Sequence, residues 1–528
     1  MSDTHAFSST PEPVSPTERL LRTLQAFLER CEAPALTEPG ETIIPLQDGS
    51  YSLDLAPGGV LLECWGDSRV LRRRITAIQR ESRTRLDVRT ERFGQRLGTL
   101  SFLDGSSGLS AQIERESTRG VARERFRRWC ERLHPDWRFE SLSTAPDLER
   151  SLSPRFPRAL LRRGNEGICA IAAPQIDTAE DLFTFALIWL HHCRTRVRGL
   201  SIKRLLLIVP ESAASQIGLR LMALDHVQIE YRLVCWTGED RLRDLSRRVW
   251  GNLDTVLHVD GLSQQPLDAV RRLFEDVAAL SEAECVREAR GGLSLEVRGL
   301  PIAHAAGDCL RVGLKQRASK RLPTVASLLR LCRHVAARRK GDGPNLQDPL
   351  YRLHPERWLE SVLRRGIRAL DPCLSPELVR RQVRGDLGTQ QGRTDLLALD
   401  ETGRLVIIEV KAETDLQLPA QALDYYIRLR LQLERGDFRT NGLFPGREIS
   451  PAPPKVLLVA PALAFHPAHE TVLGYLESSI QVLQIGIAIE WRKELRVVFQ
   501  HPLGPNRQGG EAHCPLIFSS RSVKRLRH

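Results

Sequence analysis

One short apolar segment that carries two opposite charges constrains this chain more than any other feature. The residues LVIIEVK (405–411) have the composition of a buried strand, yet they include Glu409 and Lys411. Side chains alternate across a strand, so Glu409 and Lys411 share one face while Val410 lies on the other. Unpaired charge is costly in a protein interior. The segment therefore predicts a site in which these charges have partners.

The segment before it predicts a third charge at the same place. TDLLALD (394–400) is another apolar run, and DETG supplies turn residues between the two. A five-residue loop, 400–404, would set residue 399 opposite 405 and Asp395 opposite Glu409, so that both carboxylates and the ammonium converge. A four-residue loop would set 395 opposite 408 and would need a bulge to restore the convergence. The site thus depends on the register of this hairpin.

Two predicted helices add polar side chains. The helix ERWLESVLRRG (356–366) carries Glu360, which is expected to add a third carboxylate through a water or a second ion, and Glu356 is its competitor one turn earlier. The helix that ends at Gly436 carries Gln421 and Tyr425, which are four residues apart and share a face. We expect this second pair to orient a substrate phosphate or a metal-bound carboxylate.

These groups suit a hard divalent cation. Asp395, Glu409, Glu360 and the backbone carbonyl of Val410 offer the oxygen ligands that Mg²⁺ (or Mn²⁺) takes while it keeps waters for a substrate phosphate. Lys411 could hold or deprotonate the attacking water and offset the charge on the phosphorane. The alternative is a surface ion pair on an edge strand, with Asp395 capping a turn. The apolar flanking residues favour a buried central strand instead.

In order along the chain, GRTD ending at Asp395, EVK from Glu409 and QALDY from Gln421 resemble the PD-(D/E)xK nuclease superfamily. QxxxY resembles its RecB-like branch, and GRTDLL with VIIEVK resembles NucS-type endonuclease domains. The resemblance covers about residues 350–500. It implies a restriction-endonuclease-like fold, a mixed sheet flanked by helices, that hydrolyses DNA phosphodiesters with a divalent metal. It also implies metal ligation by Asp395 and Glu409 and a catalytic role for Lys411. The proline before the aspartate in the family motif is Thr394 here.

The chain, 528 residues long, is too long for one core, which predicts an α/β multidomain protein. The expected divisions are an N-terminal tail and helix (1–39), a β-rich, Arg-rich domain (40–110), an α/β domain (112–238), a mixed α/β domain (239–345), the nuclease-like domain (350–502) and a basic tail (503–528).

Residues 120–236 and 356–491 share a coarse order of helices and apolar strands. An alignment of the two segments places Ala172 at the position of Glu409 and Pro174 at that of Lys411. We interpret residues 112–238 as a degenerate nuclease-like copy that cannot perform the second copy's chemistry. Generic α/β patterning is the alternative.

The formal charge of +12 fits a polyanionic partner, with DNA first among the candidates. Only eight of the 77 basic residues Lys and Arg are lysines, so an arginine-rich compositional bias is the alternative. Arginines in 40–105 are expected either to track phosphates or to cover a solvated sheet face. The scattered cysteines, eleven in number, the absence of a signal peptide and the short apolar runs favour a cytoplasmic protein with no membrane partner.

The sequence therefore predicts a divalent-metal-dependent DNA endonuclease. The alternatives are a nucleic-acid-binding scaffold with a vestigial nuclease fold, and hydrolysis of RNA. A homodimer is one arrangement that would cut both strands. His191-His192-Cys193 and FHPAHE (465–470) lack the spacing of a zinc site, and no P-loop occurs.

Overall fold

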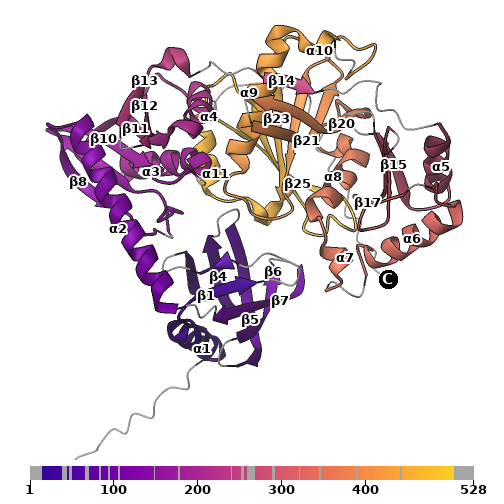
Figure 1. The fold of residues 1–528 in the computed structure, drawn as a ribbon, viewed down its shortest axis with the longest axis horizontal. Helices are drawn as coiled ribbons and strands as arrows, with labels where there is room; N and C mark the ends of the chain where they lie inside the picture. The colour runs from indigo at the N-terminus through magenta and orange to yellow at the C-terminus, as the bar shows by residue number, and fades with distance from the viewer. Residues whose placement is uncertain are drawn as a thin grey trace, which may run out of the picture.

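Four β-sheets organise the described part of this computed structural model (Figure 1). The described residues are 15–37, 44–46, 50–56, 58–65, 70–82, 85–92, 95–104, 108–147, 149–176, 179–238, 241–250, 255–258, 268–287, 292–307, 309–319, 321–343, 347–387, 390–440 and 443–504. Residues 1–14 and most of the predicted basic tail, 505–528, lie outside these ranges.

The N-terminal part is β-rich, as predicted. Its seven-stranded antiparallel sheet has the order β2-β1-β7-β6-β5-β4-β3. Helix α1 (Pro16–Arg30) packs Leu24, Phe27 and Leu28 into the core of this sheet. The sheet begins before residue 40, with β1. Its strands are β1 (Pro34–Thr37), β2 (Ile44–Pro45), β3 (Tyr51–Ala56), β4 (Gly59–Trp65), β5 (Val70–Glu81), β6 (Arg85–Arg92) and β7 (Gln95–Asp104).

The middle part is a six-stranded mixed sheet of order β13-β12-β11-β10-β9-β8. Helix α2 (Gly108–Leu133) leads into it, α3 (Leu182–Arg196) follows β10, and α4 (Glu211–Met222) follows β11. The strands are β8 (Arg138–Ser143), β9 (Arg158–Arg163), β10 (Glu166–Ala172), β11 (Ser201–Pro210), β12 (Glu230–Thr237) and β13 (Arg241–Leu245).

The C-terminal part is a seven-stranded mixed sheet of order β14-β20-β21-β22-β23-β24-β25. Helix α8 (Pro355–Arg365) precedes β20, α9 (Leu418–Arg435) and the short α10 (Asp437–Thr440) follow β22, and α11 (Ala468–Leu473) follows β23. Gly436 ends α9 with a left-handed φ of 79°, as its sequence position predicts. The strands are β14 (Thr255–His258), β20 (Leu374–Leu387), β21 (Gln390–Asp400), β22 (Leu405–Val410), β23 (Lys455–Pro461), β24 (Val482–Ile487) and β25 (Val497–Leu503).

The middle and C-terminal sheets share one topology. Apart from the additional edge strand β14, the first three strands of each sheet are antiparallel, the next two join in parallel, and the last is antiparallel. The helices also match, since α3 corresponds to α9 and α4 to α11. The shared order of elements expected from the sequence is therefore present in the fold.

The region 239–345, expected as one mixed unit, divides among three sheets, and its first strand, β13, belongs to the middle sheet. Strand β14 pairs with β20 of the C-terminal sheet. The rest forms a five-stranded antiparallel sheet with α5 (Asp268–Ala279) and α6 (Val325–Arg338), and α7 (Pro349–Arg352) leads on to α8. Its strands are β15 (Ala283–Arg287), β16 (Leu293–Val297), β17 (Leu300–Ala306), β18 (Cys309–Val312) and β19 (Arg317–Ala318).

This accessory sheet packs against α8. A Cβ atom on Gly299, in the β16–β17 turn, would lie 2.1 Å from the carbonyl oxygen of Arg357 in α8. Only glycine allows so close an approach at its φ of 75°. The turn therefore fixes the position of the helix that carries Glu360.

Helices α3, α4, α9 and α11 lie between the middle and C-terminal sheets (Figure 1). One hydrophobic core continues through this layer from one sheet to the other. Among the described helices none is long and apolar enough to cross a membrane.

Candidate functional site

The hairpin β21–β22 has the register that the site requires. Leu399 pairs with Leu405 and Leu396 with Ile408, so of the two loop lengths considered, the five-residue loop is the one present. This register sets Asp395 opposite Glu409 at the end of the hairpin. The site lies at the carboxyl end of β22, whose partner β23 is parallel, which is where open α/β sheets bind ligands.

The Glu409 side chain is buried, and Asp395 beside it is half-buried. Glu409 is 2% exposed, and Asp395 accepts a hydrogen bond from the backbone N–H of Val410 at 2.9 Å. Burial raises the pKa of Glu409 well above its usual range, and the neighbouring Asp395 raises it further. Burial also raises the pKa of Asp395, which is hydrogen-bonded to the Glu409 carboxyl. In the metal-free protein the pair therefore tends to keep a proton.

Lys411 supplies the positive charge of the site. Its Nζ lies 3.9 Å from Glu409 Oε1 and 3.3 Å from Asp415 Oδ2. Burial lowers the pKa of Lys411, but the carboxylates of Glu409, Asp415 and Asp395 outweigh burial and raise it. Of the two roles left open by the sequence, this charge favours holding a water or phosphate over deprotonating one.

Helix α9, which contacts β22, carries Gln421 and Tyr425. Burial, and then the nearby charges of Glu409 and Asp395, raise the pKa of Tyr425, so its hydroxyl stays protonated as a donor. The side-chain oxygen of Gln421 is buried without a hydrogen-bond partner. The structure thus places Tyr425 of the QxxxY motif close enough to the predicted ligands for their charges to affect it.

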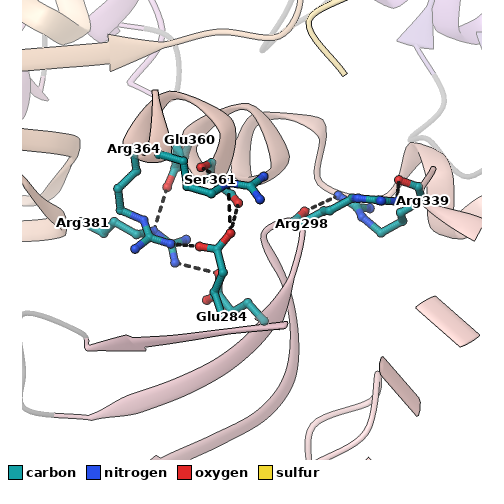
Figure 2. A network of polar contacts seen from close by, with 9 residues as sticks. Glu284, Arg298, Arg339, Glu360, Ser361, Arg364 and Arg381 are labelled. Carbon is teal, nitrogen blue, oxygen red and sulfur yellow. Dashed lines mark hydrogen bonds and ion pairs between the residues drawn. The ribbon is translucent and has the colours of Figure 1, made fainter. Parts of the chain in front are cut away.

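Glu360 has a different set of partners from those expected. Its Oε2 accepts from Arg381 Nε at 3.4 Å, and Arg381 Nη1 also donates to Glu296 Oε2 at 2.8 Å. Figure 2 shows Glu360 facing Arg381, in a network that also includes Arg364, Ser361 and Glu284 of the accessory sheet. The charge of Glu360 still raises the pKa of Glu409. Glu360 is therefore near the site but anchored to an arginine.

The charges of the site also affect Glu356, the alternative to Glu360 on α8. Burial raises the pKa of Glu356, and Glu413 and Asp395 add to the increase while Lys411 opposes it. Glu356 and Glu360 thus approach the same charges from successive turns of α8, and the choice between them stays open.

The residues fit a divalent cation. Glu409 Oε2 and Gln421 Oε1 are both buried acceptors without a hydrogen-bond partner, and buried oxygens of this kind normally have a donor or an ion. Within the described ranges, no group of three or more His, Cys, Asp or Glu side chains is placed to hold a metal ion. A cation here would rely on Asp395, Glu409 and the carbonyl of Val410, and would keep several waters, as Mg²⁺ commonly does.

Sequence reasoning missed three residues around the site. Asp415 pairs with Lys411, and its carbonyl accepts a hydrogen bond from His469 Nε2 at 2.8 Å. Arg381 comes from β20, a strand that the sequence did not suggest. The spacing of Lys411 and Asp415, four residues apart, was the one available signal.

The N-terminal sheet contacts the loop that follows β22. Arg73 of β5, 5% exposed, lies 3.4 Å from Glu413. Other arginines of this sheet have acidic neighbours too, since Arg72 pairs with Glu63 at 2.7 Å and Arg85 with Asp87 at 2.7 Å. These pairs favour the interpretation of a solvated, charge-balanced sheet over a continuous phosphate-tracking face.

The middle unit has none of the polar groups of the site. However, the predicted alignment of Ala172 with Glu409 and of Pro174 with Lys411 is wrong. Lys411 N donates to Val459 O, and Ala173 N donates to Ile208 O, the equivalent carbonyl. Strand pairing therefore places Ala173 at the position of Lys411 and Ile171 at that of Glu409. The error was one residue, which in a strand exchanges the two faces.

In the middle unit, Arg158 lies opposite Ile171 on the neighbouring strand. Asp395 has the same position relative to Glu409 in the C-terminal unit. The buried guanidinium of Arg158 donates to the carbonyl of Ala145 at 2.6 Å and lies over the ring of Trp189. The middle unit thus has the positively charged side chain of Arg158 where the C-terminal unit has the carboxylate of Asp395.

No protein-family model matches this sequence, and no curated protein matches it.

Proposed function

We propose that this chain is a divalent-metal-dependent DNA endonuclease of the PD-(D/E)xK type, with Mg²⁺ or Mn²⁺ as its metal. The observation that carries the proposal is the adjacent pair Asp395 and Glu409, with an unpartnered oxygen on the buried Glu409, beside the Lys411 ammonium. A carboxylate buried as deeply as Glu409 destabilises a protein unless it serves a ligand or a partner. The order of strands and helices around the pair supports the same superfamily.

A divalent ion at this site would supply Lewis acidity for a phosphodiester and its attacking water. Asp395, Glu409 and the Val410 carbonyl would hold it, while Glu409 and Asp395 give up their shared proton. Lys411 would donate to the scissile phosphate or the water and neutralise developing charge. Tyr425 and Gln421 would orient the substrate from α9.

The test is cleavage of labelled single-stranded, duplex, flap and mismatched DNA, with RNA alongside, in Mg²⁺ or Mn²⁺. We expect metal-dependent cutting of DNA, lost in Asp395→Ala and Lys411→Ala while DNA affinity stays within about a few-fold, since these residues serve the chemical step. Unchanged cleavage in these variants, when folded, would contradict the site assignment. Cutting of RNA alone would replace DNA as the substrate.

A second candidate is a nucleic-acid-binding scaffold. The observation in its favour is the middle unit, which has the same topology with Arg158, Ile171 and Ala173 at the positions of the site residues. DNA binding without cleavage by the wild-type chain would support the scaffold over the nuclease.

A further inference from the structure

The middle and C-terminal units pack against each other as two subunits of a dimer would. Helix α3 contacts α11, and α4 contacts α9, which are the reciprocal pairs under the correspondence of α3 with α9 and α4 with α11. A contact in which element i meets j and j meets i is the signature of a two-fold interface.

The backbone shows the same reciprocity. Leu224 follows α4 and Leu476 follows α11, and these two residues form an isolated antiparallel bridge with each other. Around it, Asp225 N donates to Tyr475 O at 2.9 Å, and Glu477 N donates to Ala223 O at 2.9 Å. Equivalent segments of the two units thus meet at a local two-fold axis.

The interface between the middle and C-terminal units resembles that of an obligate dimer. Arg220 of α4 is 4% exposed and holds Asp424 of α9 through Nε and Nη2, each at 2.7 Å, and Gln216 donates to the same carboxylate at 2.8 Å. These polar groups lie within the hydrophobic core that both units share. Obligate subunit interfaces have this buried, core-like composition.

The middle unit has a different residue at each position that corresponds to a predicted site residue. Arg158, Ile171 and Ala173 stand at the positions of Asp395, Glu409 and Lys411. Gln421 and Tyr425 are the fourth and eighth residues of α9, and the fourth and eighth residues of α3 are Phe185 and Trp189. Both aromatic side chains are buried.

We propose that residues 138–245 take the place of a second nuclease subunit, so that the chain acts as a monomer and cuts one strand per binding event. This inference rests on the proposed function. Each event consumes one water: its oxygen forms a bond to phosphorus, one P–O ester bond breaks, and the proton passes to the leaving oxygen or to solvent. The surface through which an equivalent second subunit would pair is occupied within the same chain, so the homodimer expected as one arrangement is not needed.

The experiment uses the full chain and the DNA that it cuts best in the panel, with a different dye on each strand and DNA in excess. We expect DNA molecules cut in one strand to accumulate first. The fraction cut in both strands should equal the fraction cut in one strand multiplied by the fraction cut in the other, as for independent events. The initial rate should rise with the first power of protein concentration. Light scattering should give the mass of one chain.

Mixing provides the internal control. An equal amount of Glu409→Gln chain should leave the rate per wild-type chain unchanged, because a monomer shares no active assembly. Concerted double-strand cuts, or a rate that follows the square of concentration, would overturn the inference while leaving the nuclease intact. Failure of the wild-type chain to cut any DNA would instead overturn the proposed function, and the inference with it.

Discussion

At the scale of single residues, the candidate site is costly to the protein that carries it. Glu409 and Asp395 are raised in pKa by burial, so the folded state binds protons more tightly than the unfolded state does. Stability from this pair is present at low pH and is lost as pH rises above the unfolded carboxyl range near about 4. A bound cation would offset that loss.

We therefore expect Glu409→Gln to raise the unfolding temperature of the metal-free protein at pH 8, and to raise it less at pH 5. Mn²⁺ should stabilise the wild type, by about 1–3 kcal/mol at concentrations well above its Kd, and should not stabilise the variant. Thermal unfolding with and without chelator measures both effects. Glu401→Gln removes an exposed carboxylate from the same hairpin and is the control, which should behave as the wild type. Equal Mn²⁺ stabilisation of Glu409→Gln would contradict a metal site at Glu409.

Asp181, at the start of α3, gives a second pH dependence. Burial raises its pKa to about 6, with Arg155 and Arg220 opposing the increase. The folded state again binds the proton more tightly, so stability is lost as pH rises from about 4 to about 6 and is flat above that. Asp181→Asn should thus be more stable than the wild type at pH 7.5 and no more stable at pH 4. Denaturant midpoints at the two pH values test this, and a stabilisation of equal size at both would refute the assignment.

At the scale of elements, the buried pair Arg220–Asp424 joins α4 to α9. Asp424→Ala would leave a guanidinium of 4% exposure without its carboxylate, and removal of one partner of a buried pair costs about 3–5 kcal/mol. Arg220→Met combined with Asp424→Leu should recover most of that loss. Equilibrium unfolding in urea gives the comparison.

The exposed pair Arg204–Glu230, 2.9 Å apart, is the matched control. Glu230→Ala should cost less than about 1 kcal/mol because solvent screens such pairs. Similar losses for Asp424→Ala and Glu230→Ala would show that the interface is not buried in solution.

The elements also show where sequence reasoning succeeds. The hairpin could be narrowed to two registers because alternation and the turn residues act within about twenty residues, and the structure has the register of the five-residue loop. Strand β20 was missed, because arginines and a proline obscure its pattern, and with it Arg381. Helix α11 ends at Leu473, and Leu476 pairs with Leu224 instead of continuing the helix. Such contacts join residues far apart in sequence, and local patterns carry no signal for them.

At the scale of the whole molecule, two α/β units of one topology share a core, and only the C-terminal unit has the site residues. The accessory sheet fixes α8 from one side through Gly299 and the network of Figure 2. The N-terminal sheet reaches the loop after β22 through Arg73 and Glu413. The order of the two copies was predictable from the sequence, but their two-fold packing and these supports were not.

The central claim is that Asp395 and Glu409 hold the divalent cation that DNA cleavage by this chain requires. The most direct measurement is the single-turnover cleavage rate in Mn²⁺ for the wild type, Glu409→Gln and the control Glu401→Gln, each with and without chelator. Loss of a metal ligand removes several kcal/mol of transition-state stabilisation, so Glu409→Gln should be slower by about 10²-fold or more, with Glu401→Gln equal to the wild type. Cleavage by Glu409→Gln at the wild-type rate, or cleavage that persists in chelator, would contradict the account.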